Sequence, residues 1–263
     1  MRALDFDPRN VHILQQLSFA YQYMRRFPEM TSSLDRALTI VPQDAGTRVQ
    51  RALVDLEWRA DTKPLDSVIT TILSEDQSAQ RRIAATALYL ALCKRDHAAA
   101  ARALAVMPVD GCHIEGIPLP RTWCEAVAAR VRGDVKSERG FLESAKAELE
   151  EIVRHQPNYP QALCALGLAN AGLGRKEEAI QLGQRAAQLL PPSKDAINGP
   201  LIIEYLAVIY AWTGEKDAAL DQLAIAATLP CDVSFGQLSL HPYWDSLRDD
   251  PRFKNILVSL APK

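Results

Sequence analysis

The stretch from Ala165 to Pro191 reads ALGLANAGLGRKEEAIQLGQRAAQLLP and decides the fold class of the chain. Its apolar residues recur at the spacing of a helix, yet glycine stands at four of its positions: Gly167, Gly172, Gly174 and Gly183. Each glycine inside a helix costs about 1 kcal/mol relative to alanine. A helical segment that keeps these glycines therefore needs them for close packing or for a turn.

The same pattern returns at a fixed interval. The residues Leu166-Gly167, Gly174, Ala179 and Ala186 match Leu206-Ala207, Gly214, Ala219 and Ala226, and an earlier stretch has Leu14, Leu17, Tyr21, Ala37 and Pro42 at corresponding positions. Small residues at 167, 179 and 186 would let two helices of one unit cross closely. Gly174 would end the first helix in a left-handed turn, and Pro191 would stop the second. Gly172 and Gly183 lie outside this pattern, which does not explain them.

A unit of about 34 residues with two helices, a Leu-Gly pair and a late Ala and Pro is typical of tetratricopeptide repeats (TPR). The sequence resembles this family over nearly its whole length. The resemblance implies an all-α fold, a right-handed superhelical solenoid of about six helix pairs with a C-terminal capping segment. The expected repeat array covers 1–233 as one continuous solenoid, irregular at about 94–140, and the expected cap covers 234–263. The helix pairs are expected at 11–44, 45–78, about 81–108, about 120–157, 160–193 and 200–233.

Both ends of the sequence add to the resemblance. In Trp244-Asp245, Leu247-Arg248 and Asp250–Phe253, the tail resembles the end of repeat arrays in bacterial multidomain regulators. In those proteins the array follows a serine/threonine kinase, a nucleotide cyclase or a winged-helix module, none of which is present in this sequence. We expect Trp244, Leu247 and Phe253 to cover the last repeat, with Pro251 starting a short final helix. The opening ALDFDP resembles the end of a repeat's second helix, which suggests a fragment of a longer protein.

Composition excludes several function classes. The 263 residues are 48% hydrophobic and 24% charged, with a formal net charge of -2. These values are ordinary for a soluble globular protein and give no basic surface for direct nucleic-acid binding. The most apolar run, Pro200–Gly214, contains Glu204 and is too short to span a membrane. The N-terminus lacks the apolar segment of a signal peptide. We therefore expect a cytoplasmic location, with membrane anchoring only through a longer protein.

The cysteines and catalytic motifs point to no enzyme. The five cysteines are Cys93, Cys112, Cys124, Cys164 and Cys231. This odd, scattered set predicts free, mostly buried thiols in a reducing compartment. The sequence has no G-x-S-x-G, P-loop or H-E-x-x-H motif, so we assign no catalytic residue, cofactor or metal. The pair Cys112-His113 could bind a metal with Cys93, His97 or Glu115, but it lacks the spacing of structural zinc sites.

The resemblance places the functional surface on the concave face, which the first helix of each repeat lines in the family. The corresponding positions are His12, Gln15, Phe19, Gln22 and Tyr23 in the first repeat, Arg82 and Tyr89 in the third, Arg121 and Arg132 in the fourth, and Glu204 and Trp212 in the sixth. Aromatic and Arg side chains are enriched at interface hot spots. Arg also pairs well with carboxylates, which favours an acidic partner. Phe19, Tyr89 and Trp212 could equally pack between repeats.

The leading hypothesis is a non-catalytic scaffold that binds a protein or peptide, as the docking or sensing region of a bacterial regulatory protein. Two alternatives stay open. One is a small-molecule sensor or enzyme with a pocket near the 108–120 loop, and the other is a structural scaffold that self-associates through its N-terminal end. The TPR subclass that binds chaperone C-termini needs Lys and Asn where Gln15 and Phe19 stand, which argues against that partner.

Overall fold

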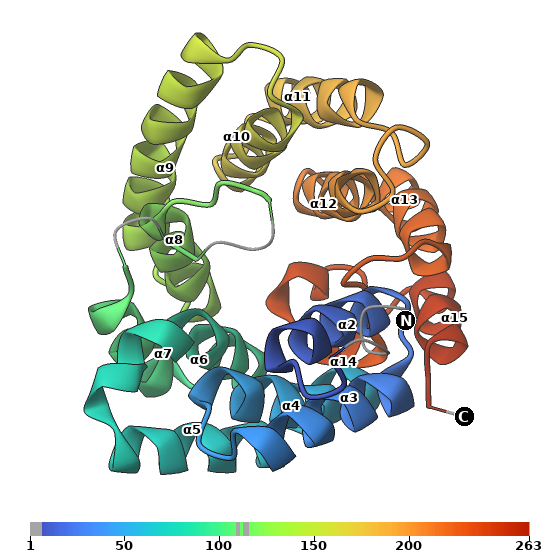
Figure 1. The fold of residues 1–263 in the computed structure, drawn as a ribbon. Coiled ribbons are helices and arrows are strands. Elements are labelled where there is room, and N and C mark those ends of the chain that lie inside the picture. The colour runs from blue at the N-terminus through green and yellow to red at the C-terminus, as the bar shows by residue number, and fades with distance from the viewer. Residues whose placement is uncertain (1–6, 109–110, 113–115, 263) are drawn as a thin grey trace.

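The computed structural model describes residues 7–108, 111–112 and 116–262, which fold into helices and contain no β-strand (Figure 1). The helices of this described part follow one another as antiparallel pairs, which confirms the all-α array of helix pairs expected from the sequence. The pairs are α2 (Val11–Tyr23) with α3 (Phe27–Ile40), α4 (Ala45–Arg59) with α5 (Lys63–Glu75), α6 (Gln80–Lys94) with α7 (His97–Val106), α8 (Arg121–Val131) with α9 (Val135–His155), α10 (Pro160–Gly172) with α11 (Lys176–Leu189), and α12 (Asn198–Trp212) with α13 (Lys216–Thr228).

The small residues act as the repeat pattern predicts. Ala179 and Ala186 are fully buried where α10 and α11 cross, while Glu177 and Glu178 are exposed on the opposite face. Gly174 has a φ of +76°, so it supplies the left-handed turn between these helices. The structure thus confirms the register inferred from the repeat.

The two unexplained glycines also prove to be packing positions. A Cβ on Gly172 would lie 2.8 Å from Leu142 Cδ1 of α9, and one on Gly183 would lie 2.8 Å from Ile209 Cδ1 of α12. Neighbouring pairs can approach this closely only because both side chains are absent. The local pattern could not reveal this, since the contacting side chains come from other repeats.

The expected irregularity lies in the third and fourth pairs. Helix α7 has 10 residues, whereas α9 has 21 residues. The irregular stretch therefore combines a short second helix in the third pair with a long second helix in the fourth. Its first turn is fixed by Asp134, whose side chain accepts a hydrogen bond from Ser137 N.

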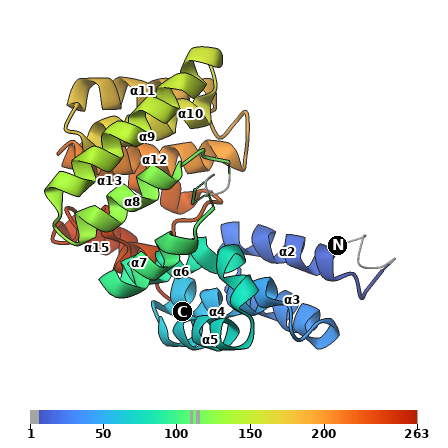
Figure 2. The ribbon, with the colours of Figure 1, turned by 90° about the vertical axis from the view of Figure 1, so that its left-hand side faces the viewer.

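The array curves until its first and last pairs meet (Figure 1). Arg25, just after α2, donates hydrogen bonds to the carbonyl oxygens of Ala227 at 2.8 Å, Leu229 at 2.7 Å and Val233 at 3.0 Å. The backbone N–H of Cys231 donates to Tyr23 O at 3.1 Å. Figure 2 shows the last three pairs stacked above the first three. The helix pairs therefore form a closed ring.

The chain then continues into the interior of this ring through α14 (Phe235–Leu240) and the short helix η2 (Pro242–Trp244), and leaves through α15 (Pro251–Ser259). Helix α14 lies against α4, and a Cβ on Gly236 would sit 1.7 Å from Leu56 O. Farther along, Trp244, Leu247 and Phe253 are buried as expected, Pro251 starts α15, and α15 contacts α13. The preceding passage across the interior was not expected.

The expectation that all five cysteines are free thiols is wrong. Cys112 and Cys124 form a disulfide with a Cα–Cα distance of 6.2 Å, whereas Cys93, Cys164 and Cys231 are free and buried. The backbone of Gly111, with φ at +87°, packs against the chain just before α8 and brings Cys112 to the first turn of that helix. Among the described helices, none is both long and apolar enough to cross a membrane.

Candidate functional site

A cavity of about 240 Å³ lies inside the ring. Helices α2, α4, α6, α8 and α12 contribute side chains to its wall, and the C-terminal segment from Asp232 to Tyr243 supplies the rest. The segment crosses the ring because its apolar residues Val233, Leu238 and Trp244 are fully buried there. The polar residues between them are thereby held against the cavity.

Three carboxylates from separate parts of the chain face this cavity. Glu57 of α4 and Glu204 of α12 are 6% and 1% exposed, and Asp232 is half-buried. Each accepts a hydrogen bond from a neutral group. The Ser234 hydroxyl donates to Glu57, Gln237 Nε2 donates to Glu204 Oε1 at 2.7 Å, and Gln22 Nε2 donates to Asp232 Oδ1 at 3.5 Å.

Burial makes these carboxylates unusually basic. It raises the pKa of Glu57 to about 7, although the hydrogen bond from Ser234 opposes the shift. Burial and the nearby Asp232 charge raise the pKa of Glu204 to about 8. The pKa of Asp232 is raised by burial to about 6. The charge of the site therefore changes over the physiological pH range.

Two polar atoms of the site have no hydrogen-bond partner among the described residues. These atoms are Glu204 Oε2 and Gln237 Oε1. Glu204 and Gln237 are only 1% and 8% exposed, and both line the cavity. Since buried polar groups in folded proteins are nearly always hydrogen-bonded, unpartnered acceptors beside a cavity mark a place for a ligand with donor groups.

An aromatic cluster also contributes to the cavity wall. The Trp123 ring stacks on Trp212 with centroids 5.5 Å apart, and the Tyr243 ring stands edge-on to His241 at 4.1 Å. Tyr89 also stacks on His241, at 5.4 Å. Burial, aided by Arg95 and Arg248, lowers the pKa of His241 to about 3. His241 is therefore neutral and adds no positive charge to the wall.

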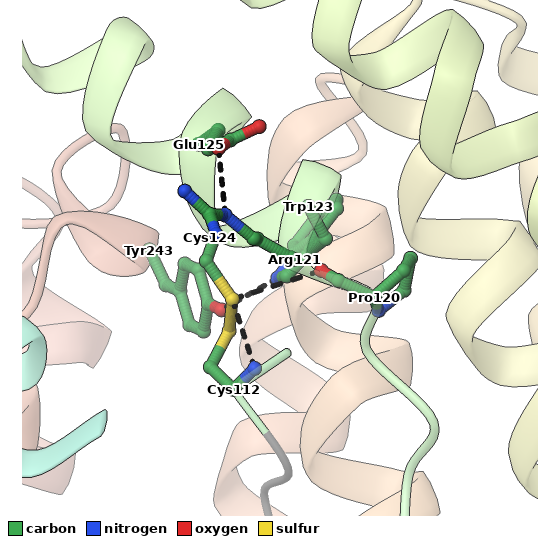
Figure 3. The surroundings of a disulfide bond; sticks show 7 residues. All are labelled: Cys112, Pro120, Arg121, Trp123, Cys124, Glu125 and Tyr243. Carbon is green, nitrogen blue, oxygen red and sulfur yellow. Dashed lines mark hydrogen bonds and ion pairs between the residues drawn. A yellow bond between two sulfur atoms is a disulfide. The ribbon is translucent and has the colours of Figure 1, made fainter. Parts of the chain in front are cut away.

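The disulfide lies at the aromatic end of the cavity, beside Tyr243 (Figure 3). Cys112 and Cys124 both contribute to the wall, so the segment leading into α8 reaches the cavity. Because its sulfur is part of the disulfide, Cys112 can neither bind a metal as a thiolate nor act as a nucleophile. His113 and Glu115, the other members of the candidate metal set near it, lie outside the described residues. The described residues contain no cluster of three metal-ligating side chains.

The structure brings together some of the residues predicted for the concave face. Gln22, Tyr89 and Glu204 line the cavity, and Trp212 stacks behind Trp123 with the Arg130 guanidinium carbon 3.8 Å from its ring centroid.

The other predicted residues lie away from the cavity, and several have local partners. Gln15 donates to Thr47 Oγ1 at 2.8 Å, Arg121 donates to Glu125 and to the Met107 carbonyl, and Tyr23 accepts from Cys231 through its carbonyl. Arg82 and Arg132 are exposed and pair with Asp76 and Asp134, each at 3.4 Å, while His12 is exposed and Phe19 is half-buried. Of the eleven residues, three therefore line the cavity: Gln22, Tyr89 and Glu204.

Glu57, Asp232 and Gln237 were not predicted as site residues. One signal pointed to buried acids: Glu204 interrupts the most apolar run of the sequence, and Glu57 lies between Leu56 and Trp58. Because α12 is apolar on nearly all sides, an acid within that run is buried with its neighbours. No local signal places Asp232 or Gln237, because they reach the cavity only through the path of the tail.

No protein-family model matches the sequence, and no curated protein matches it. Two solved structures are similar in fold. A thermophilic TPR protein from Thermus thermophilus is 18% identical over 95% of this chain and 98% of that one, with a TM-score of 0.36. PilW, described as a widely conserved type IV pilus biogenesis factor, is 15% identical over 94% of this chain and 98% of its own, with a TM-score of 0.45. At these identities the likeness concerns the helical fold alone.

Proposed function

We propose that the chain is a non-catalytic binding scaffold of TPR-type helix pairs that recognises its ligand in the interior cavity. The observation that supports this role is the set of buried, unpartnered acceptor atoms on the cavity wall. Burying a polar group without a partner costs about 1–3 kcal/mol in proteins. A ligand that supplies the missing donors recovers this free energy, so the wall favours binding.

The path of the tail favours a cavity over a long open groove. Residues from Asp232 to Tyr243 occupy part of the interior of the ring, against α4, α6 and α12, where an extended peptide would lie in an open array. We infer that a protein or peptide ligand inserts one side chain or terminal group into the cavity. In this role the chain would be the docking or sensing region of a bacterial regulatory protein.

One observation favours a second candidate, a small-molecule sensor. Cys112 and Cys124 line the cavity, so the pocket expected near the 108–120 loop coincides with it. A cavity of about 240 Å³ is somewhat smaller than the usual pockets for drug-sized ligands, which begin near 300 Å³. It suits a small metabolite as well as one side chain of a partner.

A cavity-filling substitution tests both candidates. Ala85 of α6 is exposed at the edge of the cavity, whereas Ala101 of α7 is exposed but lies outside it. We would select peptides from a random display library on the wild-type chain and measure their Kd values by fluorescence anisotropy. Ala85→Trp should weaken binding at least tenfold (on the order of 1.4 kcal/mol), and Ala101→Trp should leave it unchanged.

Two other outcomes decide between the candidates. Peptides that bind Ala85→Trp as tightly as the wild type would place recognition outside the cavity and overturn the proposal. If no peptide is selected, but a metabolite mixture raises the Tm of the wild type and of Ala101→Trp and not that of Ala85→Trp, the sensor is the correct alternative.

A further inference from the structure

We infer that the cavity binds an alkylammonium group, presented either by a free amine or by the lysine side chain of a partner. This inference rests on the proposed binding role of the cavity and names the chemistry of its ligand. It follows from the carboxylates of the wall, from the hydrogen-bonding capacity of its free atoms, and from the aromatic side chains that also line the cavity.

The first observation is that, in the described part of the chain, the three carboxylates have no cationic partner. Within the described residues, no Lys, Arg or His nitrogen lies within 4.0 Å of a carboxylate oxygen of Glu57, Glu204 or Asp232. Their hydrogen-bond partners, Gln22, Ser234 and Gln237, are all neutral. Buried charges are ordinarily paired. A cationic group in the cavity would supply the partner that the chain itself does not provide.

The nearby arginines are engaged elsewhere. Arg25 donates to three backbone carbonyls at the end of α13 and just after it, and Arg248 donates to the carbonyls of Leu238, Ser239 and His241. Arg95 binds the Leu240 carbonyl and the Asp245 carboxylate, and Arg130 binds Glu138. These guanidinium groups hold the backbone around the cavity in place, and none forms an ion pair with the three carboxylates.

The second observation concerns donors and acceptors. The free atoms Glu204 Oε2 and Gln237 Oε1 can only accept hydrogen bonds when Glu204 is ionised. An ammonium group has three N–H donors and no acceptor. It therefore supplies the kind of donor that both free acceptors lack. An anionic or acceptor-rich ligand would leave the same atoms unpartnered.

The third observation is the aromatic wall. Trp123, Tyr205 and Tyr243 are buried around the cavity and present apolar ring surface to it. Aromatic faces attract a cation within about 6 Å of the ring centroid, and they also cover its alkyl stem. Glu204 and Tyr205 are adjacent on α12 and both line the cavity, so acidic and aromatic groups converge on the same space.

The affinity should depend on pH, because the ammonium group binds the ionised carboxylates. With pKa values raised to about 7 for Glu57, about 8 for Glu204 and about 6 for Asp232, each is largely protonated below its own value. Raising the pH from 6 to 8 ionises them and should tighten amine binding about tenfold or more. The other titratable or charged groups around them are Arg25, Tyr89, Cys93, Arg95, Arg130, Cys164, Tyr205, Cys231, His241, Tyr243 and Arg248. The tyrosines, the cysteines and His241 stay neutral over this range.

The test is calorimetric titration of the whole chain at pH 8 with 1,4-diaminobutane, with Nα-acetyl-lysine methylamide and with the uncharged 1,4-butanediol. We expect both amines to bind and the diol not to bind, with a change in tryptophan emission because Trp123 lines the cavity. Tighter binding of the diamine identifies a free amine as the ligand, and tighter binding of the lysine derivative identifies a partner's side chain.

The matched variants are Glu204→Gln and Glu57→Gln, with Glu178→Gln of the exposed face of α11 as control. Each cavity variant should reduce amine affinity at least tenfold and should retain or increase the Tm of the free chain, since it removes a buried charge. A merely structural role of Glu204 would lower the Tm and leave the affinity unchanged. That result, or equal binding of the diol, would overturn the inference.

Failure of this inference is distinguishable from failure of the proposed function. If neither amine binds, but selected peptides without Lys bind the wild type and lose affinity in Ala85→Trp, the cavity is a binding site of different chemistry. If neither amines nor peptides nor metabolites bind, both the ammonium site and the binding role are wrong.

Discussion

The stack from α10 to α13 and the cavity beside it differ in how they fill space. Within the stack, Ala179, Ala186, Ala219 and Ala226 are fully buried, and Gly167 lets Ile209 of the next pair approach. The cavity instead retains buried acids and unpartnered oxygens. The repeat pattern thus produces a tightly packed, regular interface. The cavity departs from this pattern, and there stability is lower and polar groups are available for binding.

Helix α12 belongs to both regions. Its Ile209 packs into the space left by Gly167 and Gly183, whereas Glu204, from the same helix, faces the cavity. One helix therefore joins the regular packing to the polar site. Substitutions that disturb one region and spare the other test whether the two are separable.

The largest expected effect is on the closure of the ring. Gly236→Ala would place a Cβ 1.7 Å from the Leu56 carbonyl oxygen, and α14 must then move away from α4. We expect a loss of more than about 3 kcal/mol in the free energy of unfolding, measured by urea denaturation. Gly140→Ala in α9, where nothing lies within 4 Å, should instead stabilise by about 0.5–1 kcal/mol. Equal effects of the two variants would contradict the contact between α14 and α4.

The next effect concerns Arg25 and its neighbour. Arg25→Ala removes three hydrogen bonds to carbonyls between the first and last pairs, and should cost about 3 kcal/mol. Arg26→Ala removes an exposed pair with Glu29 and a contact with the Tyr21 ring, and should cost about 1 kcal/mol. Thermal unfolding of both variants checks the difference. A small effect of Arg25→Ala would show that the ring is not held closed at this point.

The dry stack gives the third prediction. Ala186→Leu adds methyl and methylene groups where α10 and α11 cross without free space, and should cost about 1–3 kcal/mol. Ala224→Leu, on the exposed face of α13, should be nearly neutral. Urea denaturation measures both. Unchanged stability of Ala186→Leu would mean that this crossing is less tightly packed than its burial indicates.

The smallest expected effect is a difference between the wild type and Glu57→Gln in how stability depends on pH. The pKa values of Glu57 and Glu204 are raised in the folded state, so ionisation of either group destabilises the fold. Their contribution to the free energy of unfolding is therefore present at low pH and is lost as the pH rises through about 7 and about 8. Wild-type stability should therefore fall between pH 6.5 and pH 8. In Glu57→Gln the fall should be smaller by about 1 kcal/mol.

Glu178→Gln is the control for this series and should follow the wild type. The pKa of His241 is lowered to about 3, so this group makes stability rise with pH. It does so below its ordinary pKa of 6.5, which is outside the window from pH 6.5 to pH 8. A stability that rises from pH 6.5 to pH 8 would contradict the burial of the two acids.

The sequence was sufficient to predict the helix pairs, because the residues that define them act locally. Gly174 ends one helix, Ala179 and Ala186 mark one crossing, and Pro251 starts the last helix. Each of these depends on a few neighbouring residues and on elementary backbone preferences. The repeat then fixed the order in which the pairs follow one another.

The candidate site could be predicted from the sequence only in part. Glu204, Tyr89 and Gln22 fell on first-helix positions that the TPR resemblance singled out, and all three line the cavity. Asp232 and Gln237 could not be placed, because their position depends on a turn of the tail into the ring. The disulfide was missed for the same reason, since it requires the path of the chain before α8.

Closure of the ring also limits how this chain can change in length. An open repeat array gains or loses a unit at little cost, because each unit contacts only its neighbours. Here an inserted helix pair would carry Gly236 away from Leu56 and Arg25 away from its three carbonyls. The number of units is thus set by geometry. Duplication of a repeat, the ordinary way in which such arrays grow, would open this chain and remove its cavity.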